Sequence, residues 1–176
     1  MKARFLFLIM FLSVTYSGFS QKIKTNNNVT LIESPKKDIK LSHRFEYKLQ
    51  KYVSTDGTFQ FFICCNFQFN TYHNFPNNAK MILKTFEGET IELTAALSMI
   101  APVPPFETSW EPTAFYPVTQ AQLEKLFKGV SYINVETLSY NYKEEKAYLD
   151  FQEEVFKKDE IGKHLNKMFM KIENKK

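Results

Sequence analysis

The chain has few of the residues that most directly reveal a function. Its 176 residues include only two cysteines, Cys64 and Cys65, which are adjacent. Neighbouring side chains on a strand point to opposite faces, so we expect two free thiols and no disulfide framework. After residue 20, Arg44 is the only arginine, and arginine is the side chain best suited to bidentate contacts with phosphates and bases. The sequence therefore gives no support for nucleic acid as a partner.

Net charge, the length of apolar runs and the spacing of histidines further limit the classes of function that the chain can have. Without Lys2 and Arg4, the 23 basic residues fall to 21 against 19 acidic ones, which leaves a net charge of only +2. No apolar run after residue 20 is long enough to span a bilayer, so we expect the mature protein not to cross a membrane. The histidines His43, His73 and His164 lack the spacing of metal ligands, and we predict no metal and no cofactor.

The first twenty residues have the layout of a secretory signal peptide. Lys2 and Arg4 precede an apolar run over 5–12, and small residues occupy the −3 and −1 positions before Gln21. We therefore expect export to the periplasm or the exterior. The predicted organisation is a signal peptide over 1–20, an N-terminal arm over 21–38 and a single domain over 39–176. The arm is mostly polar, and we expect it to be loose, with room for one short strand.

A first β-hairpin is predicted from apolar residues that alternate with other residues over 44–53 and again over 59–69. A three-residue loop between the two strands pairs Val53 with Phe59, so that the apolar residues of both strands share one face. Gly57 then lies third in the loop, where a left-handed conformation is favoured.

A second hairpin is predicted around Gly88. Burial favours a three-residue loop over 87–89, which pairs Leu83 with Leu93. Residues 91–99 continue the apolar alternation after this loop, as one strand.

Two helices and the fold class follow from the second half of the chain. Thr119 and Gln122 have the spacing of a capping box, and Gly129 suits the end of a short helix. The chain ends in an amphipathic helix capped by Asp159, with Leu165 in its apolar stripe. We predict an α+β fold, a twisted antiparallel sheet of about six strands with the C-terminal helix packed on one face. A lipocalin-like β-barrel is the alternative.

One stretch resembles known proteins. Residues Tyr116 to Leu126, followed by Gly129, Val130 and a strand, are similar to a family of small exported bacterial α+β proteins of unassigned function. Those proteins also pair a sheet with a lysine-rich terminal helix. The resemblance covers roughly the last third of the chain. It implies a fold and an address in the bacterial envelope, and it implies no activity.

Two candidate sites follow from residue types. Cys64 faces Lys48 in the predicted hairpin, and a nearby ammonium group favours the thiolate, so Cys64 is a candidate reactive thiol. Its alternative role is that of a small, half-buried side chain. Phe106, Trp110 and Tyr116 gather in a proline-rich segment, and loops on a rigid sheet often carry binding surfaces. The alternative for Trp110 is a plug at the end of the core.

Together these features predict a non-enzymatic accessory or binding module of the bacterial cell envelope. Its partner is unknown, with an envelope protein or a glycan as the candidate classes, and we predict no catalytic residues. The alternatives are a secreted hydrolase with its site in a cleft and a carrier of a small apolar ligand in a hollow interior.

Signal-peptide cleavage is the first testable prediction. We expect protein recovered from the periplasm or the medium to begin near Gln21, which intact-mass measurement checks. Full-length protein that retains Met1 and is recovered from the cytoplasm would contradict export.

Overall fold

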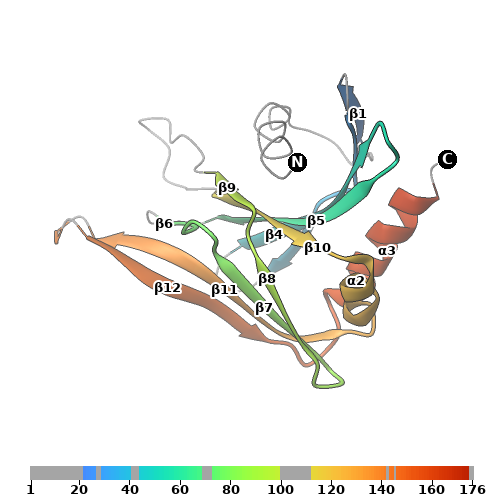
Figure 1. The fold of residues 1–176 in the computed structure, drawn as a ribbon. Coiled ribbons are helices and arrows are strands. Elements are labelled where there is room, and N and C mark those ends of the chain that lie inside the picture. The colour runs from blue at the N-terminus through green and yellow to red at the C-terminus, as the bar shows by residue number, and fades with distance from the viewer. Residues whose placement is uncertain are drawn as a thin grey trace.

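The described part of the chain is mostly β-strand (Figure 1). The computed structural model describes residues 22–26, 29–40, 44–68, 73–99, 112–141, 143–144 and 146–174. The predicted signal peptide, His43, Phe106 and Trp110 lie outside these residues. Within them, the strands form two antiparallel sheets of seven and five strands.

Sheet 1 has the strand order β1-β2-β4-β5-β10-β9, with β3 also paired to β4. Its strands are β1 (Lys22–Asn26), β2 (Val29–Glu33), β3 (Lys37–Lys40), β4 (Arg44–Ser54), β5 (Phe59–Gln68), β9 (Leu97–Met99) and β10 (Thr113–Val118). Sheet 2 has the order β12-β11-β7-β8, with β6 also paired to β11. Its strands are β6 (His73–Asn74), β7 (Lys80–Thr85), β8 (Thr90–Thr94), β11 (Val130–Asn141) and β12 (Lys146–Val155).

The two sheets share one apolar core. Side chains from both sheets meet in it, including Phe45, Phe67, Leu83 and Val135, all of them buried. We call the face of each sheet that contributes to this core its inner face and the opposite face its outer face. In Figure 1 the two helices lie at one end of the sheets, and the β11–β12 hairpin reaches away at the other end.

The prediction of one sheet of about six strands is wrong, as is the barrel alternative. The antiparallel strands belong to two sheets, and these do not close into a barrel. The apolar run over 91–99 is the physical reason, because it is divided between the sheets. The Ala95 N–H donates to Ala79 O beside sheet 2 (2.9 Å), and the next N–H, of Ala96, donates to Phe115 O in sheet 1 (2.9 Å). The apolar alternation over 91–99 is therefore uninterrupted even though the chain changes from one sheet to the other at Ala95 and Ala96.

The first hairpin is confirmed in every respect. Val53 pairs with Phe59 across β4 and β5. The Ser54 N–H donates to Thr58 O (2.8 Å), which closes the three-residue loop. Gly57 has φ +82°, the left-handed conformation expected of the third loop position.

The register predicted for the second hairpin is wrong by two residues. Leu83 pairs with Ile91 rather than Leu93, because the loop is Phe86 to Gly88 and not 87–89. Gly88 becomes the third loop residue with φ +88°, as Gly57 is in the first hairpin. A shift of two residues leaves each side chain on its face. Burial therefore did not distinguish the two registers, and the turn decided between them.

Residues 22–26 and 29–40, expected to be a loose arm with one short strand, contribute three strands to sheet 1. They form β1, β2 and β3, and β2 pairs with β4 from Val29↔Ser54 to Glu33↔Gln50. The eleven-residue β4 has one side occupied by β5, and β2 and β3 together line its other side. Leu31 of β2 is buried, so apolar burial fixes a segment whose composition is mostly polar.

Both predicted helices are present. Helix α2 (Gln120–Leu126) has the expected capping box, with the Gln122 N–H donating to Thr119 Oγ1 (3.2 Å) and the Thr119 N–H donating to Gln122 Oε1 (2.9 Å). The C-terminal helix α3 (Gly162–Glu173) packs against β4 and α2, and Leu165 is fully buried in the inner core. Within the described ranges, neither helix has the length and apolar composition needed to cross a bilayer.

A single carboxylate organises the start of α3. Asp159 Oδ1 accepts the Val130 N–H (3.2 Å) and the Gly162 N–H (2.8 Å), and Oδ2 accepts the Lys163 N–H (3.1 Å). Asp159 thus accepts first-turn N–H groups as the predicted cap does, although it lies two residues before the N-cap residue Ile161, whose side chain makes no capping hydrogen bond. The same carboxylate also holds the first residue of β11. Gly162 is required here because a Cβ at this position would lie 2.3 Å from Leu126 O.

Truncation of the α3 stripe tests the packing. We expect Leu165→Ala to lower the free energy of unfolding by about 2–5 kcal/mol, since it leaves a cavity in the core. The exposed Lys167 of the same helix supplies the control. Lys167→Ala should change the free energy of unfolding by less than about 0.5 kcal/mol. Chemical denaturation measures both variants. Equal effects would mean that α3 is not packed on the sheet.

Candidate functional site

The two adjacent cysteines lie on opposite faces of β5, as predicted. Cys65 belongs to the inner core, and Cys64 belongs to a second group of buried side chains on the outer face of sheet 1. Both thiols are free. The predicted register is also confirmed at this point, since Cys64 pairs with Lys48 of β4.

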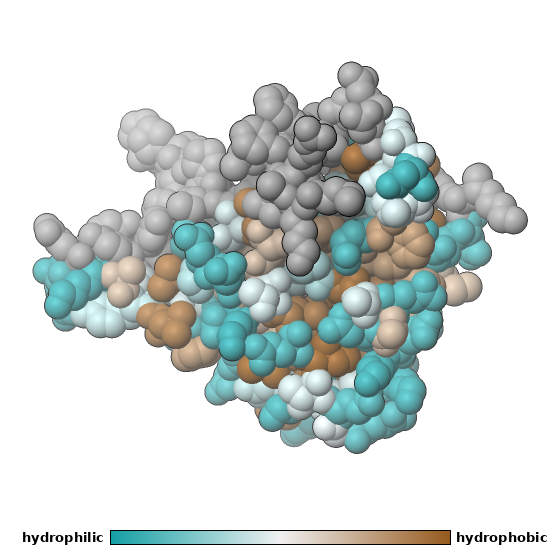
Figure 2. Space-filling view, in the orientation of Figure 1, coloured by the Kyte–Doolittle hydropathy of each residue, from teal (hydrophilic) through white to brown (hydrophobic). Residues whose placement is uncertain are grey.

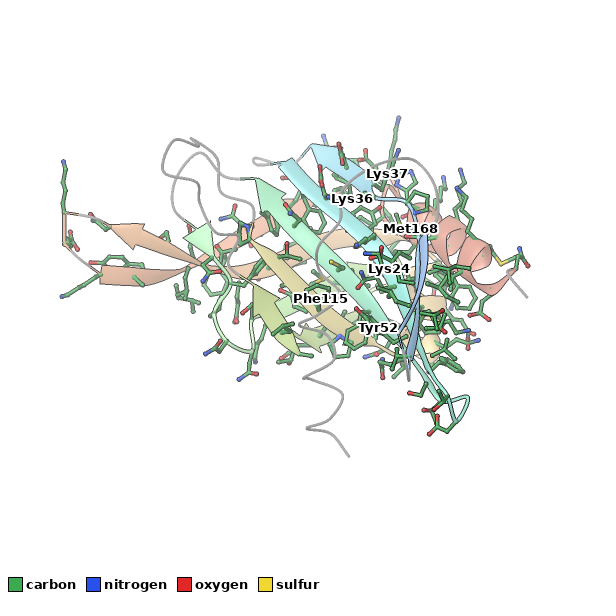
Figure 3. All side chains as sticks on the ribbon, turned by 90° about the horizontal axis from the view of Figure 1, so that it is seen from above. Lys24, Lys36, Lys37, Tyr52, Phe115 and Met168 are labelled. Atoms are coloured by element: carbon green, nitrogen blue, oxygen red, sulfur yellow. The ribbon has the colours of Figure 1, made fainter. Side chains whose placement is uncertain are left out.

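The apolar group around Cys64 is assembled from four strands, and we call it the outer cluster. Its buried members are Val29, Leu31, Tyr52, Phe62, Cys64 and Phe115. The rings of Tyr52 and Phe62 meet edge to face with centroids 5.2 Å apart. Figure 3 looks onto this side of sheet 1, with Lys24, Lys36, Tyr52 and Phe115 labelled. An antiparallel sheet commonly has one solvated, polar face. Sheet 1 is unusual because it carries buried apolar side chains on both of its faces.

A partly buried ion pair adjoins the outer cluster. Glu33 Oε1 accepts hydrogen bonds from Lys48 Nζ (2.5 Å) and from Gln50 Nε2 (2.5 Å). Burial alone would raise the pKa of Glu33, but the charge of Lys48 and these hydrogen bonds outweigh it and hold the pKa below its ordinary value. Glu33 is therefore a carboxylate at neutral pH. The other end of the Gln50 amide, Oε1, is buried without a hydrogen-bond partner.

The Cys64 thiol is governed by burial rather than by Lys48. Burial raises its pKa to about 11, and the opposing effect of the Lys48 ammonium group is smaller. The thiol is consequently protonated at neutral pH, and a thiol is a much weaker nucleophile than a thiolate. The assignment of Cys64 as a reactive thiol stays a prediction, with the electrostatic balance against it.

Tyr116 lies on the other side of sheet 1 from Cys64. It pairs with Ile63, is fully buried in the inner core, and its hydroxyl group has no hydrogen-bond partner among the described residues. Burial raises its pKa well above the ordinary value. The structure thus places Tyr116 in the core. Because Phe106 and Trp110 lie outside the described residues, their grouping with Tyr116 as a binding surface stays a prediction.

The remaining candidate chemistry concerns metals and histidines. His164 Nδ1 lies 3.2 Å from the hydroxyl oxygen of Tyr47, a hydrogen bond that ties α3 to β4. Burial and the nearby Lys37 and Lys167 lower the pKa of His164, so this histidine is neutral at pH 7. In the part of the chain that the structure describes, no three His, Cys, Asp or Glu side chains are placed to hold a metal ion together.

The structure also exposes a surface that sequence reasoning missed. Leu149, Phe151 and Val155 of β12 lie on the outer face of sheet 2 and are 55%, 48% and 70% exposed. We call these three residues the β12 stripe. Apolar surface is visible in Figure 2 near the position that β12 occupies in Figure 1. The two-residue spacing of Leu149 and Phe151 was the available signal in the sequence.

Polar groups surround the β12 stripe. Glu136 of β11 lies opposite Phe151, and Tyr132 lies opposite Val155. Glu153, between Phe151 and Val155, accepts the Tyr132 hydroxyl hydrogen bond (2.8 Å). The ammonium group of Lys84 lies 4.9 Å from the centre of the Tyr132 ring. The stripe is therefore an exposed apolar strip with a mostly acidic margin.

Comparisons of the chain with protein-family models, with curated proteins and with solved structures find no match. The resemblance to small exported bacterial proteins accordingly stays an expectation.

The buried Glu33 carboxylate makes a prediction about pH. Because its pKa is lowered in the folded state, the stabilisation it provides is complete above the ordinary value of 4.5. It is lost as the pH falls from there through the lowered pKa, since the unfolded chain takes up the proton first. We expect the free energy of unfolding to fall less steeply in Glu33→Gln than in the wild type as the pH is lowered below the ordinary value of 4.5.

Denaturation curves at a series of pH values measure this difference. Glu124→Gln removes an exposed carboxylate of α2 and should keep the wild-type slope. Parallel curves for Glu33→Gln and the wild type would show that the Lys48–Glu33 pair does not contribute as described.

Proposed function

We propose that the protein is an exported, non-enzymatic binding module of the bacterial cell envelope that binds a partner protein through the β12 stripe. Export rests on the signal-like first twenty residues. The binding role rests chiefly on the exposure of three large apolar side chains along one strand. Leu149 and Phe151 are neighbours on this face, and Val155 follows beyond Glu153. Exposed apolar side chains grouped in this way, rather than occurring singly, are typical of surfaces that bind other molecules.

The composition of the stripe favours a protein as the partner. Protein interfaces combine a centre of apolar and aromatic side chains with a polar rim, which is the arrangement of Phe151 between Leu149 and Val155 with Glu136 and Glu153 beside them. The two carboxylates give this margin a negative charge. We therefore expect a partner surface with apolar side chains at its centre and lysine or arginine at its margin.

The candidate nucleophile, Cys64, does not favour the alternative of a secreted hydrolase. Cys64 is buried and its pKa is raised to about 11, whereas a catalytic thiol has its pKa lowered by a positioned base or charge. The three residues of the β12 stripe carry no group that transfers protons, so their exposure points to binding and not to chemistry.

A charged substitution in the stripe tests this function. Val155→Asp places a carboxylate beside Glu153 and should abolish retention of the partner from an envelope extract, because it replaces one of the three apolar side chains with a charge and enlarges the acidic margin. The side chain is 70% exposed, so the free energy of unfolding should change by less than about 0.5 kcal/mol. Met170→Asp, at a site on α3 that is 51% exposed, is the matched control and should bind normally.

Retention alone does not locate the surface, so the complex is also probed by hydroxyl-radical footprinting. Leu149, Phe151 and Val155 should become protected from oxidation in the complex, while Met170 stays reactive. Equal retention by the two variants, unchanged oxidation of the stripe, or a retained component that proves to be a glycan would each contradict the proposal.

A further inference from the structure

The strand that carries the stripe also has an unpaired side. Among the described strands, β12 hydrogen-bonds to β11 only, and it forms the margin of sheet 2 (Figure 1). Just beyond its end, the Phe156 N–H donates to Ser131 O (2.8 Å) on the β11 side. Backbone groups alternate between the two sides of a strand. The even-numbered N–H groups of β12 therefore face β11, and the odd-numbered ones face outward.

The backbone of Phe151 supports this assignment. Its N–H is accepted by Asp150 Oδ1 (2.8 Å), which accounts for one outward-facing donor at the middle of the strand. A ten-residue strand with one unpaired side is a template for a further strand, and natural sheets protect such strands with charged side chains. Asp150 is a protection of this kind, yet Leu149, Phe151 and Val155 leave the same strand largely apolar on its outer face.

We infer that β12 pairs with β12 of a second copy of this chain, antiparallel, with the two-fold axis at Phe151. This goes beyond the proposed function, because it uses the unpaired backbone side of the strand and takes a second copy of the chain as its partner, in addition to the protein bound on the outer face. The odd-numbered residues then form the hydrogen-bonded pairs, and Phe151 exchanges both backbone hydrogen bonds with Phe151 of the second copy.

Charge and length together select this register among those that keep the outer side chains on one face. An axis at Leu149 also opposes no like charges, but it pairs only residues 146–152 of β12, whereas the axis at Phe151 pairs residues 147–155. With the axis at Asp150, two aspartates lie directly opposite each other, and with the axis at Gln152 each Asp150 lies opposite a Glu154. Like charges in directly opposed positions destabilise a sheet. With the axis at Phe151, no like charges are directly opposed along β12.

The pairs formed in this register are complementary. The two Phe151 rings meet at the axis, and aromatic pairs are among the more favourable cross-strand contacts. Each Val155 lies opposite Ala147, each Leu149 lies opposite Glu153, and each Asp150 lies opposite the uncharged Gln152. The interface is isologous, so it closes at the dimer and does not propagate. It joins two five-stranded sheets into one continuous sheet with both β12 stripes side by side.

Cysteine cross-linking tests the register. In a hydrogen-bonded antiparallel pair the Cα atoms lie about 5.5 Å apart, within the range of about 4.4–6.8 Å that a disulfide needs. Phe151→Cys should therefore give a covalent dimer under mild oxidation. Leu149→Cys is the matched control, because it faces Glu153 of the second copy and lies roughly 13 Å from its own counterpart. It should remain monomeric on a non-reducing gel, as should the wild type, whose cysteines are both buried.

Sedimentation provides the second measurement. The wild type should sediment as a dimer, and Phe151→Glu, which opposes two charges at the axis, should sediment as a folded monomer. Met170→Glu should remain a dimer. Wild-type protein that stays monomeric at all concentrations, or Leu149→Cys that cross-links as fully as Phe151→Cys, would overturn the inference. Neither of these results bears on whether Val155→Asp loses partner binding, so the dimer and the proposed function can be contradicted independently.

Discussion

The Asp159 carboxylate is the interaction on which the arrangement of the two sheets depends. Its oxygens accept backbone N–H groups from the start of β11 and from the first turn of α3, so one side chain ties the longest strand of sheet 2 to the helix that closes the inner core. The contact between Gly162 and Leu126 O leaves no space for a side chain, which also fixes where α3 passes the end of α2. Leu165 reaches the core only because the helix begins at this point.

The elements that were predicted correctly are those determined by residues close together in the chain. The first hairpin followed from its alternation and from Gly57, and the capping box of α2 followed from Thr119 and Gln122. The second hairpin shows the limit of burial as a criterion. Pairing Leu83 with Ile91 or with Leu93 buries the same face, and only the requirement for a left-handed third residue, met by Gly88, separates the two registers.

Contacts between distant segments account for what the sequence did not reveal. The opposite orientation of Cys64 and Cys65 is a property of one strand and was predictable. The burial of Cys64 depends on Leu31 and Phe115, far from it in the chain, and this burial is what outweighs the charge of Lys48. The change of sheet at Ala95 likewise depends on hydrogen bonds to Ala79 and Phe115. The pattern over β12 was compatible with a strand, but its exposure follows from its position at the margin of sheet 2.

The path of the chain between the sheets has a consequence for the order of folding. The chain leaves sheet 1 after β5, forms β6 to β8 in sheet 2, returns for β9 and β10, and then crosses through α2 to β11 and β12. Sheet 1 is complete only with β10 (Thr113–Val118) and sheet 2 only with β12 (Lys146–Val155), and contacts of long sequence separation slow folding. The first half therefore has no finished sheet of its own. For a chain proposed to be exported, that delay is useful, because a protein that cannot fold before its last residues emerge stays extended for as long as transport lasts.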